Sequence, residues 1–191
     1  NLLGHYNVSN ALAAMASCAS LGVDLDRMVD ALGHMESVPG RLEKVPNRRG
    51  IHCFVDYAHT DDALSNVLTT LRELGPRRLL VVFGCGGNRD KTKRPLMGAV
   101  AARLADHVIV TSDNPRNEEP EKIMADIVEG IKSSHSFEKM VDRKEAIAKA
   151  IGLAQRGDIV LIAGKGHENY QEFSHTVIPF DDRVVARNYL E

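Results

Sequence analysis

Strand-like and helix-like segments alternate along most of this chain, and that alternation constrains its fold more than any other feature. Apolar runs such as "LLVVF" and "IVLIAG" are continuous, which is typical of strands covered on both faces. The pattern predicts an α/β fold with a doubly wound, mostly parallel, Rossmann-like sheet. We expect strands at residues 51–57, 77–83, 107–111, 139–143, 157–163 and 176–180, the last of them as an antiparallel edge strand.

A short helical segment precedes this alternating region. Residues 7–22 and 25–35 carry apolar side chains at helical spacing, and Pro39 with Gly40 then breaks the pattern. We expect residues 1–37 to be the helical end of another domain and residues 38–191 to form the sheet domain. Because the first residue is Asn1 and a helix follows almost at once, we expect the chain to be a piece of a longer protein.

Composition limits the classes of function. The 191 residues carry a formal net charge of −2, which gives no case for nucleic-acid binding through a basic face. No apolar run approaches the roughly 20 residues of a membrane span, and the start does not resemble a signal peptide. The three cysteines are scattered, which argues against disulfides or a zinc site. We therefore expect a cytoplasmic protein with no nucleic-acid or membrane partner.

Four unusual stretches follow predicted strands. They are "DYAHT", "GCGGNRDKTKRP", "SDNPR" and "AGKGHENYQ". In doubly wound sheets, ligands bind outside the carboxyl ends of the strands. We therefore expect all four stretches to lie on one rim of the sheet and to form the ligand site.

The stretch "GCGGNRD" is similar to a dinucleotide fingerprint but lacks its third glycine, because Arg89 occupies that position. One interpretation is a simple glycine-rich turn between a strand and a helix. The other is an anion site, since Arg89, Lys91, Lys93 and Arg94 lie beside the expected helix start.

The stretch "AGKGHE" is similar to the end of a phosphate-binding P-loop, but Lys165 is followed by Gly166 instead of Ser or Thr. No Walker A sequence occurs in the 191 residues, so these residues alone supply no phosphate loop for a nucleoside triphosphate. Gly164 and Gly166 would let a ligand approach the backbone closely, and Glu168 is a candidate partner for a cation.

Two further stretches allow a structural and a functional interpretation. In "DYAHT", the structural interpretation makes Asp56 a helix cap and His59 a turn residue. The functional interpretation makes Asp56 an acceptor for a nucleotide ribose and His59 a neighbour of phosphate or metal. In "SDNPR", Asp113 and Asn114 favour a turn, but a turn does not require Arg116. The planar guanidinium of Arg116 can bind both oxygens of a carboxylate. Because positive and negative side chains are expected on the same rim, the expected ligand is a zwitterion with more than one carboxylate and more than one ammonium group.

Six motifs together resemble the C-terminal part of the Mur ligases. They are "GHYNVSNALAA", "VPGRLE", "DYAHT", "FGCGGNRDKTKRPLM", "SDNPR" and "GKGHENYQ", in this order. The resemblance implies three domains, of which the sugar-binding domain and most of the ATPase domain lie upstream, with the phosphate loop and a carbamylated lysine that holds Mg²⁺. It also implies ATP-dependent addition of meso-diaminopimelate to UDP-N-acetylmuramoyl-L-alanyl-D-glutamate, through an acyl phosphate, in peptidoglycan synthesis.

The resemblance further implies roles for individual residues. Those placed near the nucleotide are Asn7, Asn10, Arg41, Asp56 and His59. Those placed around meso-diaminopimelate are Arg89, Asp113, Asn114, Pro115, Arg116, Gly164 and Glu168. Arg116 is expected to meet the distal carboxylate that lysine lacks, and Glu168 the distal ammonium. No general base is assigned, although Asp56 and His59 are candidates, and no metal ligand is expected in this segment.

Some positions depart from the family pattern, and other functions stay open. Asp61 stands where many relatives have proline, and Asn88 and Thr92 replace an aspartate and a glycine. The alternatives are a non-catalytic amino-acid-binding module and a folylpolyglutamate-type ligase domain. Since ATP and Mg²⁺ would be bound mainly by upstream domains of the same protein, we expect these 191 residues alone to be inactive.

Overall fold

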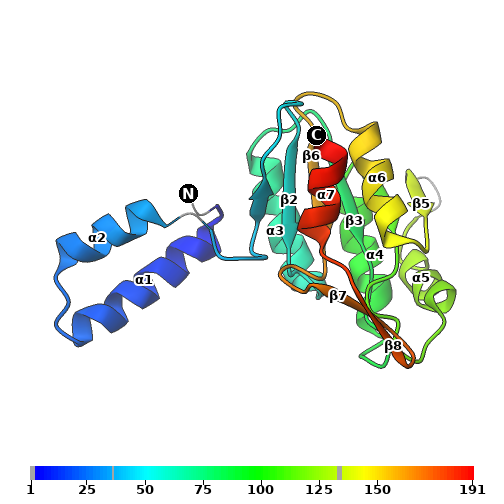
Figure 1. The fold of residues 1–191 in the computed structure, drawn as a ribbon, viewed down its shortest axis with the longest axis horizontal. Coiled ribbons are helices and arrows are strands. Elements are labelled where there is room, and N and C mark those ends of the chain that lie inside the picture. The colour runs from blue at the N-terminus through cyan, green and yellow to red at the C-terminus, as the bar shows by residue number, and fades with distance from the viewer. Residues whose placement is uncertain (1–2, 36, 133–134) are drawn as a thin grey trace. The chain divides into compact units, whose positions relative to one another are not determined.

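A six-stranded sheet, five of whose strands run parallel, forms the centre of residues 39–191 (Figure 1). The structure is a computed structural model that describes residues 3–35, 37–132 and 135–191. The strands follow the spatial order β1-β2-β6-β3-β4-β5. Their bounds are β1 (Glu43–Val45), β2 (His52–Asp56), β3 (Leu79–Phe83), β4 (His107–Val110), β5 (Phe137–Lys139) and β6 (Ile159–Ala163). The predicted doubly wound, mostly parallel fold is confirmed.

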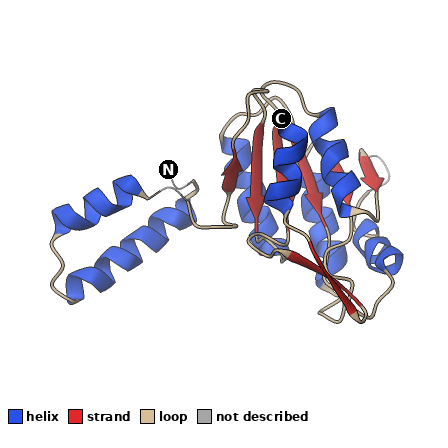
Figure 2. Ribbon diagram, viewed as in Figure 1, coloured by secondary structure: helices blue, strands red, loops and turns tan. Residues whose placement is uncertain are grey.

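Helices cover both faces of this sheet (Figure 2). On one face α3, α4 and α5 pack side by side, and α6 and α7 pack together on the other. Their bounds are α3 (Asp61–Glu73), α4 (Lys93–Leu104), α5 (Pro120–Val128), α6 (Arg143–Leu153) and α7 (Asp182–Leu190). Every residue of β3 and β6 is buried, as expected for strands covered on both faces.

Two short strands differ from the sequence prediction. The antiparallel edge strand exists, but it is β1 and not residues 176–180. Those residues contribute β8 (Thr176–Pro179), which pairs with β7 (Tyr170–Phe173) in a separate hairpin. The hairpin is held away from the sheet because β7 bonds to the loop after β4. The strand expected at 139–143 ends at Lys139, since Asp142 already caps α6.

The chain divides into two compact units, Asn1–Val38 and Pro39–Glu191. The first unit consists of α1 (His5–Ser20) and α2 (Leu25–His34). Asp24 caps α2, because its carboxylate accepts hydrogen bonds from the backbone N–H groups of Asp26 and Arg27. The second unit contains the sheet and all four rim loops.

A buried ion pair joins the helices of one face to the carboxyl ends of two strands. Arg143 and Asp182 are both fully buried, and two guanidinium nitrogens lie 2.8 Å from the two carboxylate oxygens. The same guanidinium donates to the carbonyl oxygens of Ser112, at 3.3 Å, and Ala163, at 2.9 Å. The pair therefore fixes the starts of the loops that follow β4 and β6.

Replacing Arg143 with Met is expected to lower the free energy of unfolding by about 3–5 kcal/mol, because it leaves the Asp182 carboxylate buried without a partner. Urea unfolding measures the change. The exposed neighbour Lys144→Met is the matched control and should change stability by less than about 0.5 kcal/mol. The double variant Arg143→Met, Asp182→Leu should recover part of the loss. An Arg143→Met protein as stable as the wild type would contradict the structural role.

Candidate functional site

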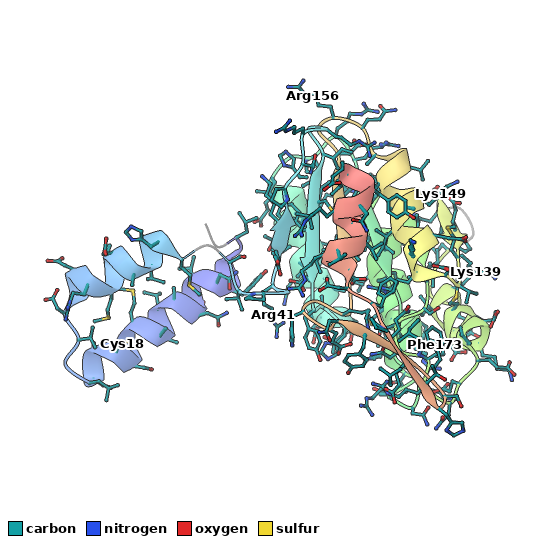
Figure 3. The ribbon with its side chains drawn as sticks, viewed as in Figure 1. Cys18, Arg41, Lys139, Lys149, Arg156 and Phe173 are labelled. Carbon is teal, nitrogen blue, oxygen red and sulfur yellow. The ribbon has the colours of Figure 1, made fainter. Side chains whose placement is uncertain are left out.

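The four rim loops meet in one open cleft of about 560 Å³ at the carboxyl end of the sheet. Figure 3 shows Phe173 at this end and Arg156 at the opposite end. The cleft is lined by Tyr57, His59, Thr60, Gly84, Cys85, Gly86, Arg89, Asp90, Lys93, Asp113, Asn114, Arg116, Gly164, Glu168 and Tyr170. All four stretches that the sequence singled out contribute side chains, so the predicted rim exists.

Two glycines let neighbouring loops touch. A Cβ atom on Gly87 would lie 1.9 Å from the carbonyl oxygen of Pro115, and one on Gly164 would lie 2.7 Å from Asp113 Oδ2. Gly164 also has φ +113°, which side-chain-bearing residues rarely adopt. These glycines therefore serve loop-to-loop packing within the protein. Pro115 is buried in this packing and does not line the cleft.

Arg94 has a structural role that the sequence interpretation missed. Its side chain is fully buried, and its guanidinium lies 3.0 Å from both oxygens of Glu118 and 2.8 Å from Asp126 Oδ2. Glu118 also accepts a 2.6 Å hydrogen bond from the backbone N–H of Asn88. These bonds, those from Arg94 first, hold the pKa of Glu118 at about 2. Arg94 thus ties the glycine-rich loop to the loop after β4 and is not available to an anion.

The other cations of that cluster have different surroundings. Lys91 pairs with Glu118 at 3.3 Å, outside the cleft. Lys93 lines the cleft and donates a 2.6 Å hydrogen bond to the carbonyl oxygen of His59. Arg89 is exposed, lines the cleft and has no carboxylate partner within the described residues. Of the four basic residues, Arg89 and Lys93 are therefore the ones placed to meet a ligand.

Arg116 lies in the cleft wall with part of its guanidinium already engaged. Its Nε is 2.9 Å from Glu172 Oε2, and Nη1 donates to the carbonyl oxygen of Gly87 at 2.9 Å. Its backbone, at φ 52°, exchanges hydrogen bonds with β7 through Glu172 and Ser174. Nη2 donates no hydrogen bond to the residues described. The arginine is therefore anchored through Nε and Nη1, and Nη2 remains for a ligand.

Asn114 is the polar centre of the loop after β4. Its Oδ1 accepts hydrogen bonds from Lys165 Nζ, at 3.0 Å, and from the backbone N–H of Glu172, at 3.1 Å. Its Nδ2 donates to Glu168 Oε2 at 3.0 Å. Asp113 is also buried, and its Oδ1 accepts from the backbone N–H of Asn114 at 2.7 Å. The "SDNPR" and "GKGHE" motifs therefore form one connected site.

Asp56 does not cap the helix that follows it. Its two oxygens accept 2.7 Å hydrogen bonds from the backbone N–H groups of Leu42 and Ala58, and burial raises the pKa of the carboxyl group. The N-cap of α3 is instead Thr60, whose hydroxyl accepts from the Ala63 N–H. The capping interpretation was wrong for Asp56. Asp56 fixes the segment after Gly40 against the end of β2.

The other residues expected near a nucleotide lie in two places. His59 is exposed at the cleft, and its Nδ1 lies 2.9 Å from the carbonyl oxygen of Tyr57. Arg41 places its guanidinium carbon 5.2 Å from the centre of the Tyr57 ring. Asn7 and Asn10 belong to α1 in the first unit, where Asn7 Nδ2 donates to the carbonyl oxygen of Leu3 at 2.7 Å. The shared nucleotide role of these residues stays a prediction.

Lys165 is the principal site residue that the sequence interpretation did not assign. Its side chain is fully buried, and its ammonium contacts Asn114, Glu168 and the face of the Tyr170 ring. The available signal was a lysine at a strand end with a carboxylate three residues later. That spacing was compared only with a P-loop, where the lysine faces phosphate.

The described part of the chain contains neither a cluster of metal ligands nor a membrane-spanning helix. Within residues 3–35, 37–132 and 135–191, no three or more His, Cys, Asp or Glu side chains come together as a set of metal ligands. Among the helices of these ranges, none has both the length and the hydrophobicity to traverse a bilayer.

Comparisons with known proteins agree with one another. The profile described as "Mur ligase, glutamate ligase domain" matches residues 40–166. UDP-N-acetylmuramoyl-L-alanyl-D-glutamate--2,6-diaminopimelate ligases from Syntrophomonas wolfei and Synechocystis sp. are 51% and 53% identical, each over 99% of this chain. The chain spans 39% and 38% of their lengths.

Solved structures give the same result. A structure of a UDP-N-acetylmuramoyl-L-alanyl-D-glutamate--2,6-diaminopimelate ligase superposes with a TM-score of 0.78 at 48% identity, covering 99% of this chain and 39% of that one. A folylpolyglutamate synthase from Mycobacterium tuberculosis, complexed with ADP, has a TM-score of 0.70 at 26% identity, covering 85% of this chain and 38% of that one.

The Arg94–Glu118 cluster predicts a specific acid dependence. The pKa of Glu118 is about 2 in the folded protein against an ordinary 4.5, so its stabilising effect is complete above pH 4.5 and is lost as the pH falls toward 2. Glu118→Gln should therefore lower the free energy of unfolding at neutral pH, and the difference from wild type should shrink over this range. Chemical denaturation at several pH values measures it. Glu121→Gln, at an exposed carboxylate, is the control, and a Glu118→Gln difference that stays constant with pH would contradict the assignment.

Proposed function

The chain belongs to the Mur ligase family, and from that membership we propose that it is the C-terminal part of an ATP-dependent ligase. The reaction proposed is the addition of 2,6-diaminopimelate to UDP-N-acetylmuramoyl-L-alanyl-D-glutamate in peptidoglycan synthesis. Relatives with this name are 46–53% identical over nearly the whole chain. In this proposal residues 1–37 are the helical end of the ATPase domain and residues 38–191 are the domain that receives the amino acid.

The arrangement of charges in the cleft is the observation that carries this proposal. Arg116 and Arg89 line the cleft with guanidinium groups, and Glu168 and Asp113 line it with carboxylates. Diaminopimelate has two carboxylates and two ammonium groups, so both kinds of charge find a partner of opposite sign. Lysine has no distal carboxylate and would leave the Nη2 of Arg116 unpaired in a partly buried position.

ATP would supply the phosphoryl group that activates the γ-carboxylate of the D-glutamate as an acyl phosphate. Arg41 and His59 are exposed and suit contacts to a nucleotide, with Tyr57 beside both. Asp56 fits this role less directly, because both its oxygens already accept backbone hydrogen bonds. The described residues present no set of metal ligands, so Mg²⁺ would be held by other parts of the full-length protein.

Positioning is the contribution that this segment would make to catalysis. Asn114 and Arg116 are held by hydrogen bonds to other loops, so this part of the site has little freedom to reorganise. Holding the incoming amine in a fixed place before it attacks the acyl phosphate lowers the entropic part of the barrier. No general base is assigned, since neither His59 nor Asp56 has a contact that singles it out.

Arg116→Ala in the full-length protein is expected to lower kcat/KM for diaminopimelate by about 10- to 100-fold, because a charge-assisted contact to the distal carboxylate is lost. Steady-state kinetics of amide formation measure it. Arg103→Ala, at an exposed arginine of α4, is the matched control and should be neutral. Unchanged kcat/KM in Arg116→Ala would remove this arginine from substrate recognition.

A substrate screen of the full-length protein tests the function itself. ATP-dependent ligation with diaminopimelate, and little with lysine or glutamate, is the expected result. Preference for glutamate on a folate acceptor would favour the folylpolyglutamate alternative, whose structural relatives are less similar in sequence. Amino-acid binding without any turnover would favour a non-catalytic module.

A further inference from the structure

Lys165 is a buried charge that the proposed reaction leaves without a role. Its side chain has 0% exposure, and its ammonium lies 3.1 Å from Glu168 Oε2 and 3.0 Å from Asn114 Oδ1. The centre of the Tyr170 ring is 5.3 Å away. An ammonium taken out of water is strongly unfavourable unless it is paired, so these contacts form one coupled group.

Glu168 is the member of this group that reaches the cleft. Its side chain is 21% exposed, and its Oε2 contacts both Lys165 and the Nδ2 of Asn114. Its Oε1 has no hydrogen-bond partner among the described residues and remains for a ligand. Glu168 therefore presents one acceptor atom to a ligand, and the ammonium of Lys165 neutralises most of its negative charge.

Asn114 contacts the same lysine. Its Oδ1 accepts from Lys165 and from the Glu172 N–H, and its Nδ2 donates to Glu168. The Glu172 N–H and the Glu168 carboxylate already fix the direction of the amide without the lysine. Lys165 adds a third hydrogen bond, so its distinct contribution to this side of the cleft is its positive charge.

We propose that Lys165 is a specificity-determining positioning residue, which neutralises Glu168 so that an ammonium alone is a weak ligand for the cleft. The amino acid must then also bring a carboxylate for the guanidinium edge of Arg116. This inference rests on the proposed function. The preference for a diamino-dicarboxylic acid then depends on two residues. One is Arg116, and the other is Lys165, which faces away from the ligand.

Removing the buried charge should affect the two candidate substrates unequally. Without Lys165, the Glu168 carboxylate beside Asp113 is uncompensated, and the cleft becomes more negative. A substrate with a net positive charge, such as lysine, then gains relative to diaminopimelate, which has none. A purely structural role would lower the use of both substrates alike.

Lys165→Met in the full-length protein is the test. We expect kcat/KM for diaminopimelate to fall about 10- to 100-fold, chiefly through KM. We expect the ratio of kcat/KM for diaminopimelate over lysine to fall at least about tenfold, with KM for ATP unchanged. Lys144→Met, at an exposed lysine, is the matched control. Lys165→Arg, which keeps the charge, should retain the ratio even if packing lowers both rates.

A double-mutant cycle with Glu168→Gln shows whether Lys165 acts through Glu168. In the Glu168→Gln protein, Lys165→Met should change the substrate ratio by less than about threefold, because there is no carboxylate charge left to balance. An equal change in both backgrounds, or an unchanged ratio in Lys165→Met, would overturn the inference. Wild-type protein that does not use diaminopimelate would instead overturn the proposed function, so the two failures are distinguishable.

Discussion

The Arg143–Asp182 ion pair is the interaction on which the rest of the site depends. Parallel strands end with carbonyl groups that have no partner in the next strand, and burying them is unfavourable. Here the Arg143 guanidinium binds the carbonyl oxygens of Ser112 and Ala163 and is itself neutralised by Asp182. Since the loops carrying Asn114 and Glu168 start at these points, their separation is set by a contact in the core.

Three further ion pairs lie closer to the cleft. Arg94 with Glu118, Arg116 with Glu172, and Lys165 with Glu168 are ion pairs, and the first two join segments far apart in the chain. In each pair at least one charged side chain is mostly buried, and Arg116 and Glu168 are the members that line the cleft. The rim is consequently ordered by its own electrostatics before a substrate arrives, which reduces the conformational entropy lost on binding.

Periodicity and strand-end reasoning predicted the sheet, its two covered faces and the convergence of four loops, because these follow from patterns within about 15 residues. They did not predict which charges face the ligand. Arg89 and Arg94 are five residues apart, yet Arg94 is buried against Glu118 and Asp126, far along the chain, and Arg89 is exposed. Asp56 was similarly misjudged, because the local pattern does not show that Leu42, which precedes β1, contacts the end of β2. The strands β1 and β7 pair with their neighbours along the chain, β2 and β8, but they are too short to leave a clear alternating pattern.

The position of Asp182 in the chain has a consequence for biogenesis. Every residue of the cleft precedes it, and β7, which holds Arg116 in place, precedes it only slightly. Until α7 has been synthesised, Arg143 lacks the counter-ion Asp182, although the strands β4 and β6 that it braces are already complete. The cleft therefore reaches its final arrangement only after the residues of α7 have left the ribosome.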